Sequence, residues 1–240
     1  MNKIKVSAVS YTNTAPFIYG IKNTSLIDRI ELSLDIPSIC AQKLIDKEVD
    51  LGLVPVAALL NIPGYEIISD YCIGATGAVN SVFIFSHKPI EEIETLRLDL
   101  QSRTSNNLAR VLLKNHWKKQ ITLTDSQQAD AFVEIGDRTF GKKDSYPYVY
   151  DLGYEWMRFS GLPFAFAVWA ANKTLPKEFI GLFNQSMKFG LDNRTKVIEA
   201  LPKRDDFDIA VYLNHSIDYE LTDKKREAIH RFHQYIKELK

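Results

Sequence analysis

The stretch that decides the fold is Leu96-Arg-Leu-Asp-Leu-Gln-Ser-Arg-Thr-Ser-Asn-Asn-Leu-Ala-Arg-Val-Leu-Leu-Lys114. Residues Leu96–Leu100 alternate between apolar and charged side chains, which predicts a half-buried strand. From Leu108 on, apolar residues recur at helical spacing, which predicts an amphipathic helix. The turn between strand and helix is polar and consists of Ser102, Arg103, Thr104 and Ser105.

This turn predicts a site for a small anion, either phosphate or carboxylate. The first N–H groups of a helix have no partner within the helix and carry partial positive charge, so they attract anions. One hydroxyl is enough to cap a helix, whereas this turn adds three hydroxyls and the guanidinium of Arg103. Simple capping by Ser102 or Thr104 is the alternative explanation.

The chain begins with a second unit of the same kind. The strand-like residues Ile4–Val9 precede a polar loop that supplies four candidate binding side chains, namely Ser10, Tyr11, Asn13 and Thr14. Because an asparagine amide both donates and accepts hydrogen bonds, Asn13 is a candidate catalytic residue that holds a hydroxyl or a developing charge. A role in the turn is the alternative for Asn13. We expect a ligand with two anionic ends to lie between the two helix starts.

Two further polar loops follow predicted strands. Asn80 and Ser81 lie in one loop, and Gly136 and Asp137 follow the predicted strand Ala131–Ile135. In open α/β sheets ligands bind beyond the carboxyl ends of the strands, so we expect all four loops to meet there. Asp137 is the only acid in these loops and is a candidate catalytic base, with helix capping as the alternative.

Strands and helices alternate along the chain up to residue 175, which indicates an α/β protein with a mostly parallel sheet, and the remainder has a helical pattern. We predict one lobe from residues 1–85 plus 171–240 and a second lobe from residues 86–170. Two extended segments, Val82–Ser86 and Phe164–Ala170, would form a hinge that allows closure over a ligand in the cleft. A single continuous doubly wound sheet is the alternative.

The composition disfavours several classes of protein. Thirty basic residues balance thirty acidic ones, which disfavours binding to nucleic acid or to an anionic membrane. No window approaches the ~18 apolar residues of a membrane span, and the N-terminus lacks a signal-peptide pattern, so we expect a cytoplasmic protein. Cys40 and Cys72 are expected to be reduced and buried.

Cofactor and metal motifs are not apparent. The sequence contains neither GxGxxG nor GxxxxGK[ST], and we expect no cofactor. Glu227, His230 and His233 share a predicted helix without a further ligand cluster, so we interpret them as solvated and expect no metal site. Among the aromatic residues, Phe164 and Trp169 are candidates to cover the apolar side of a ligand.

Seven motifs occur in a fixed order up to about Lys173: Val9–Pro16, Val49–Pro55, Gly77–Val82, Ser102–Ser105, Ala131–Asp137, Tyr150–Trp156 and Gly161–Ala170. Together they resemble the chorismate dehydratase (MqnA) family of menaquinone biosynthesis. The chain departs from the family pattern at Thr12, where leucine is usual, and at Ala78, where proline is common. Neither departure removes a side chain that we expect to bind ligand.

The resemblance implies a two-lobed, periplasmic-binding-protein-like (type II) fold with a two-strand hinge, used as a lyase without a cofactor. Such enzymes convert chorismate to 3-[(1-carboxyvinyl)oxy]benzoate and water, the first step of the futalosine route. Chorismate carries two carboxylates, which suits the two helix starts. The related 1,4-dihydroxy-6-naphthoate synthase and a non-catalytic binding protein for a small dicarboxylate are the alternatives. The oligomeric state, monomer or dimer, stays open.

Overall fold

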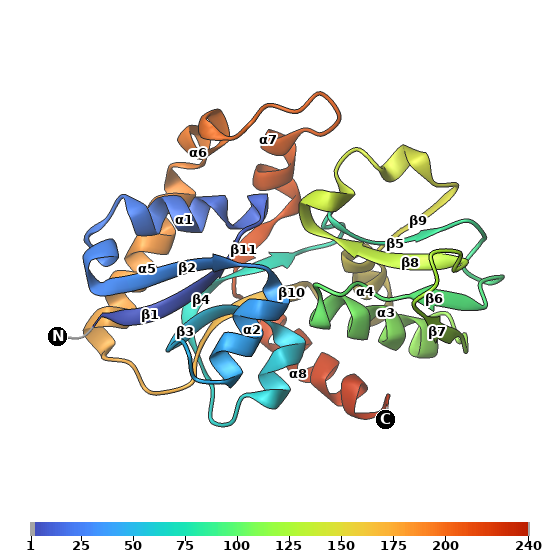
Figure 1. Cartoon of the computed structure of the whole chain (residues 1–240), viewed down its shortest axis with the longest axis horizontal. Coiled ribbons are helices and arrows are strands. Elements are labelled where there is room, and N and C mark those ends of the chain that lie inside the picture. The colour runs from blue at the N-terminus through green and yellow to red at the C-terminus, as the bar shows by residue number, and fades with distance from the viewer. Residues whose placement is uncertain (1–2, 240) are drawn as a thin grey trace.

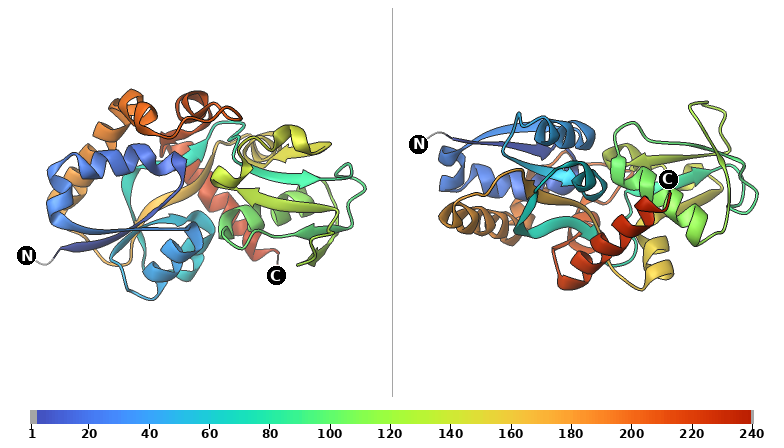
Figure 2. Two further views of the ribbon diagram at one scale, coloured as in Figure 1. Left: turned by 45° about the horizontal axis from the view of Figure 1, so that its top comes forward. Right: turned by 90° about the horizontal axis from the view of Figure 1, so that it is seen from below.

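Two separate β-sheets form the framework of the computed structural model, which describes residues 3–239 (Figures 1 and 2). The six-stranded sheet has, in spatial order, β11 (Asp218–Glu220), β4 (Glu66–Ala75), β10 (Phe164–Ala171), β3 (Leu51–Pro55), β1 (Ile4–Val9) and β2 (Ile30–Asp35). The five-stranded sheet has β7 (Thr122–Thr124), β6 (Thr95–Arg97), β8 (Ala131–Ile135), β5 (Val82–Ser86) and β9 (Tyr148–Asp151). The two-lobed α/β prediction is therefore confirmed, and the single continuous sheet is excluded.

Helices cover both sheets. The longer ones are α1 (Ala15–Lys22), α2 (Pro37–Ile45), α3 (Arg103–Asn115), α4 (Leu152–Ser160), α5 (Lys177–Asp192), α6 (Arg194–Ala200) and α8 (Asp223–Lys237). The short ones are α7 (Ile209–Val211), the 3-10 helices η1 (Thr12–Thr14), η2 (Ser25–Arg29), η3 (Val56–Asn61), η4 (Gly136–Thr139) and η5 (Lys143–Ser145), and the π-helix η6 (Tyr212–Ser216). Helix α8 contacts both β10 and α3, so it touches both lobes (Figure 2).

Both sheets are mixed, so the prediction of a mostly parallel sheet was wrong. Strand β1 runs parallel to β2 and β3, whereas β10 runs antiparallel to β3 and β4. In the second sheet β5 is antiparallel to β8 and β9, while β6 is parallel to β7 and β8. The antiparallel pairing of β4 with β10 follows from the path of the chain, which leaves the first sheet after β4 and returns to it through β10.

The chain crosses between the sheets at residues 76–81 and 161–163. Both segments predicted as hinge strands are strands, but each belongs to one sheet: Val82–Ser86 to the second and Phe164–Ala171 to the first. The predicted lobe limits of 1–85 with 171–240 and of 86–170 therefore stay a prediction. Both crossings between the sheets lie several residues before the predicted lobe limits.

The stretch around α3 shows where local pattern succeeds and fails. Ser102 caps α3, as the capping alternative predicted: its Oγ accepts from the N–H of Ser105 at 3.0 Å. The preceding strand is shorter than predicted, since β6 ends at Arg97 and Leu100 is 92% exposed. The carboxylate of Asp99 accepts from the N–H of Gln101, 2.8 Å away, and this turn ends the strand.

The predictions for β4 and α4 were correct, whereas the prediction that the C-terminal part is wholly helical was wrong. The pattern at Glu66–Ala75 predicts a strand, and β4 has these bounds. Asp151 and Gly161 predict the cap and the end of a helix, and α4 is capped by Asp151 and ends at Gly161, whose φ is +72°. Beyond Leu175 the chain is not wholly helical, because Asp218–Glu220 forms strand β11. Three residues are too few to show a period in sequence.

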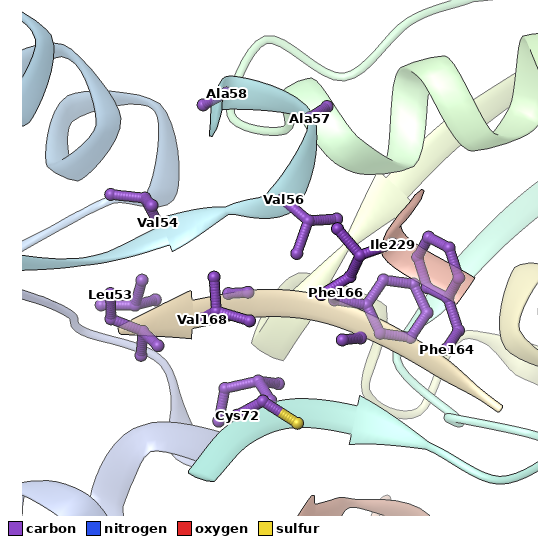
Figure 3. Packing of buried hydrophobic residues seen from close by; sticks show 14 of the residues in the cluster. Leu53, Val54, Val56, Ala57, Ala58, Cys72, Phe164, Phe166, Val168 and Ile229 are labelled. Carbon is purple, nitrogen blue, oxygen red and sulfur yellow. The ribbon is translucent and has the colours of Figure 1, made fainter. Parts of the chain in front are cut away.

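The core is centred on β10, which is buried along its whole length. Figure 3 shows Phe164 and Phe166 beside Ile229 of α8, with Cys72 on the adjacent strand. Cys40 and Cys72 are free and buried, as predicted; burial raises the pKa of these thiols to about 11 and about 12.

One polar residue of α8 also belongs to the core. The imidazole of His233 is buried, and its Nε2 lies 2.7 Å from the carbonyl oxygen of Val56, so the interpretation of His233 as solvated was wrong. The apolar stripe of α8 had suggested that His233 points to solvent. In the structure η3 packs against α8 and covers this residue. Among residues 3–239, the helices all lack the combination of length and apolar character that a bilayer crossing requires.

Candidate functional site

A small cavity of about 60 Å³ lies between the two sheets. The first sheet and its loops line it with Val9, Tyr11, Asn13, Pro37, Pro55, Ile73, Phe166 and Ala167. The second sheet and the crossing line it with Val79, Ser81, Val82, Ser102, Thr104, Ser105, Ile135 and Gly136. This volume has room for only a few water molecules, and hydrogen bonds join the two lobes beside it, from Tyr11 to Gln101 and from Thr12 to Asp137.

The start of α3 forms one wall. Ser102, Thr104 and Ser105 all line the cavity and are almost fully buried. The Oγ1 of Thr104 accepts from the N–H of Ala57 in η3 at 3.1 Å, so this hydroxyl also bridges the lobes. Arg103 does not line the cavity, contrary to expectation. Neighbouring helical residues point about 100° apart, and the Arg103 guanidinium donates instead to Gln42 of α2 at 2.8 Å.

The opposite wall contains Asn13 in η1, a buried residue held by three contacts. Its Nδ2 donates to the hydroxyl of Tyr212 at 3.3 Å, and its Oδ1 accepts from Thr14 Oγ1 at 3.2 Å. Its carbonyl oxygen accepts from the hydroxyl of Tyr219 at 2.9 Å. Thr14 itself is fully buried behind Asn13 rather than at the cavity, and Ser10 is exposed beside β2.

Asp137 lies across the cleft from η1 rather than in the cavity lining. Its two carboxylate oxygens each accept from the N–H of Thr12 at 3.1 Å, and Oδ2 also accepts from Thr12 Oγ1 at 2.9 Å. Asp137 thus caps η1, and not the segment that follows it. Burial raises the pKa of this carboxyl above its ordinary value, and the hydrogen bonds from Thr12 and the charge of Arg204 oppose that rise.

Gly136 brings the lobes into close contact. Its φ of +66° turns the chain after β8, and its N–H donates to the carbonyl of Ser81 at 2.8 Å. A Cβ at this position would lie 2.6 Å from Cε2 of Tyr11, so only glycine permits the observed approach. The hydroxyl of Tyr11 forms a hydrogen bond with the side chain of Gln101, again across the cleft.

The loop at residues 80 and 81 divides its side chains between two places. Ser81 lines the cavity, and its Oγ accepts from the hydroxyl of Tyr212 at 2.8 Å. Asn80, with φ of +56°, points instead to a separate surface pocket. Its amide contacts Ser216 at 3.1 Å and Lys143 at 3.1 Å. Asn80 therefore does not meet the other predicted residues.

The two predicted covering aromatics are core residues. Trp169 is fully buried against Phe17 and Phe183, with ring centroids 6.0 and 5.0 Å away. Phe164 packs in an aromatic group near α8 (Figure 3), and the β10 ring that lines the cavity is that of Phe166. Because β10 is covered on both faces, its continuous apolar sequence does not distinguish the ring at the cavity from the rings in the core.

Sequence reasoning missed the two tyrosines that hold Asn13. Tyr212 and Tyr219 belong to the C-terminal segment and lie about 200 positions from Asn13 along the chain. Neither stands in a motif or at a recognisable helix start, so no local signal identifies them. Within the described chain, no three histidine, cysteine or acidic side chains come close enough together to hold a metal ion.

Comparison with known proteins identifies the family. The sequence profile of a family described as menaquinone biosynthesis matches residues 4–238. The chain belongs to this menaquinone biosynthesis family. The predicted family is thereby confirmed, and with it a function in menaquinone biosynthesis.

One relative and two solved structures show what else this chain is similar to. A chorismate dehydratase of Thermus thermophilus is 24% identical over 224 residues, covering 81% of this chain and 80% of that protein. The crystal structure of an Archaeoglobus fulgidus protein has a TM-score of 0.76 at 15% identity, covering 98% of this chain and 97% of that one. A Candida albicans protein described as having the generic periplasmic binding protein fold has a TM-score of 0.65 at 11% identity, covering 100% and 94%. These likenesses confirm the predicted fold.

Proposed function

We propose that this protein is a chorismate dehydratase, which converts chorismate to 3-[(1-carboxyvinyl)oxy]benzoate and water. The observation that carries the proposal is one cavity with neutral hydrogen-bonding groups on both walls, Asn13 and Ser81 facing the start of α3. Family membership and the name of the Thermus thermophilus relative supply the substrate. Chorismate has a carboxylate at each end, and helix starts with hydroxyl groups bind anions.

In this proposal one carboxylate of chorismate binds at the start of α3. Ser102, Thr104 and Ser105 bring their hydroxyls to that position, beside the positive end of the α3 dipole. The other end of the substrate lies near Ser81 and Asn13. The lining of the cavity contains no Asp, Glu, Lys, Arg or His among the described residues, so the field at the substrate comes from dipoles rather than from charged side chains.

The chemistry is elimination of water from adjacent ring carbons. The proton at C3 is acidified by conjugation through the ring to its carboxylate, and the electron pair left at C3 moves into the ring. Loss of the C4 hydroxyl as hydroxide, which takes up the proton, gives an aromatic ring and one water molecule. Asn13 is the residue proposed to orient the leaving hydroxyl or the ether oxygen, because it lines the cavity and its NH₂ group has a second proton besides the one donated to Tyr212.

The base is either Asp137 or the enolpyruvyl carboxylate of the substrate. The raised pKa of Asp137 suits a base, but both of its oxygens accept hydrogen bonds from Thr12 and neither residue lines the cavity. A base has to come within hydrogen-bond reach of the proton that it removes. These contacts favour the substrate carboxylate as the base and Asp137 as a cap for η1.

Closure of the lobes is part of the same proposal. The cavity is smaller than a ring-sized ligand, so chorismate enters while the lobes are further apart. Closure then brings Asn13 and the start of α3 to opposite sides of the substrate and excludes water from the reaction.

Incubation of the purified protein with chorismate tests the proposal. We expect loss of the diene absorbance together with an aromatic product whose mass is that of chorismate less one water. Saturable binding of chorismate without turnover would favour a non-catalytic binding protein instead. If chorismate is neither bound nor converted, the proposal is contradicted and the related naphthoate synthase is favoured.

A further inference from the structure

Tyr212 lies directly behind two residues of the cavity wall. It is 1% exposed, and its hydroxyl lies 3.3 Å from Nδ2 of Asn13 and 2.8 Å from Oγ of Ser81. Asn13 and Ser81 line the cavity, whereas Tyr212 does not. One buried hydroxyl therefore connects the wall of the first lobe with the crossing segment between the lobes.

The direction of these hydrogen bonds follows from the chemistry of the groups. An amide nitrogen only donates, so the Tyr212 oxygen accepts from Asn13, and its single proton goes to Ser81. Since Ser81 Oγ accepts from Tyr212, its own proton points elsewhere, and the cavity is the open side of this residue. The Asn13 oxygen accepts from Thr14, so the plane of the amide is fixed at both ends.

The ring that carries this hydroxyl is itself fixed. Phe140 and Phe207 meet the Tyr212 ring edge-on, with centroids 5.2 and 5.3 Å away. These two phenylalanines stack on one another at 3.8 Å and 9°. Burial raises the pKa of Tyr212, which keeps the hydroxyl protonated in neutral solution.

We propose that Tyr212 is a positioning residue: its hydroxyl fixes the Asn13 amide and leaves the Ser81 hydroxyl free to donate to an oxygen atom of the substrate. The inference rests on the proposed function, because it gives Asn13 and Ser81 their roles toward chorismate. It adds to that function a residue from the C-terminal segment that never contacts the substrate.

The kinetic test is Tyr212→Phe, which removes the hydroxyl and keeps the ring. A misplaced catalytic group costs about tenfold or more in rate, so kcat should fall at least about tenfold while KM changes less than about threefold. The matched control is Tyr150→Phe. That hydroxyl accepts from the N–H of Ile90 at 2.8 Å in the second lobe, and its loss should leave kcat within about twofold of wild type.

A double variant shows whether Tyr212 acts through Asn13. Residues that act as a unit are not additive. Adding Tyr212→Phe to Asn13→Ala should therefore lower kcat by a smaller factor than in the wild-type background, and the factor that remains reports the bond to Ser81. A general loss of stability would lower kcat by the same factor in both backgrounds. Equal losses of kcat in the two phenylalanine variants, or full additivity, would overturn the inference.

A measurement without turnover separates this inference from the proposed function. The side-chain NH₂ signals of Asn13 are identified in a ¹⁵N spectrum by their absence from Asn13→Ala. In Tyr212→Phe these signals should shift and exchange faster with water, and in Tyr150→Phe they should not change. If wild-type protein fails to act on chorismate, the proposed function is wrong, and this spectrum still decides the role of Tyr212. Unchanged Asn13 signals in Tyr212→Phe would contradict it.

Discussion

The two helix starts at the cavity are completed in different ways. The start of α3 is capped from within its own turn, by Ser102 accepting from the N–H of Ser105. The start of η1 has no cap from its own sequence, since the preceding Tyr11 makes no side-chain cap. Its first N–H, that of Thr12, is capped by Asp137, which lies 125 positions later and in the other lobe.

Under the proposed function, this difference separates a preformed wall from one that closure completes. Because the cap of the α3 wall lies within its own lobe, the proposed function gives this wall the first contact with an anion. The η1 wall gains its cap only when the lobes meet, and it holds Asn13, the proposed catalytic residue. In this proposal the α3 wall binds the anion, and the η1 wall holds the Asn13 amide.

The largest effect is expected from Asn13→Ala, which removes the amide of the closure-dependent wall. Loss of one donor that stabilises developing charge lowers kcat by about 10²–10³-fold. Binding of chorismate to the α3 wall should change far less, which separate measurements of kcat and Kd will show. Full activity of Asn13→Ala would end its assignment as a catalytic residue.

The second effect is expected from Gly136→Ala, which blocks closure. The new Cβ would lie 2.6 Å from the Tyr11 ring, so the lobes should stay apart and KM should rise by about tenfold, equivalent to about 1.4 kcal/mol. Gly64→Ala is the matched control, because Gly64 also has a positive φ, of +65°, but no atom within 4 Å of the added Cβ, and it lies away from both crossings between the sheets. Small-angle X-ray scattering should show a larger radius of gyration for Gly136→Ala alone. Identical KM values in the two variants would argue against blocked closure.

A smaller effect is expected from Ser102→Ala, which removes the local cap of the preformed wall. Loss of such a cap lowers the free energy of unfolding by about 1 kcal/mol. Thr222→Ala is the control, since Thr222 caps α8 in the same way, at 3.3 Å from the N–H of Lys225. Both variants should lose similar stability in urea unfolding, but only Ser102→Ala should weaken chorismate binding. Equal chorismate affinity in both would remove Ser102 from the site.

The smallest effect is expected from Asp137→Asn. A general base contributes about 10²–10⁴-fold, so a loss of activity below about tenfold would exclude Asp137 as the base and agree with its role as a cap. A loss beyond about 10²-fold would instead restore it as the base.

The same substitution should change the dependence of stability on pH. The folded pKa of Asp137 is raised, so its stabilising contribution is fully present below the unfolded pKa of about 3.9 and is lost as pH rises through the folded pKa. Urea unfolding from pH 3.5 to pH 7 should therefore show wild type losing stability relative to Asp137→Asn as pH rises. A constant difference over that range would contradict the raised pKa.

The predictions from sequence succeeded where a hydrogen bond or a strand is local. The caps at Ser102 and Asp151 and strand β4 follow from patterns within about ten residues. The family was recognisable because its motifs occur in a fixed order along the chain. Arg103, Asn80 and the rings of β10 were misplaced because their direction depends on which element packs against them.

The amino-acid sequence by itself determined most of the elements, the family and the local cap at the start of α3, since caps and periodicity act over three or four residues. The tertiary structure alone decided which side chains share the cavity. Asp137 reaches Thr12 over 125 positions and Tyr212 reaches Asn13 over 199. Contacts of that span depend on how two lobes close, and no local pattern encodes that geometry.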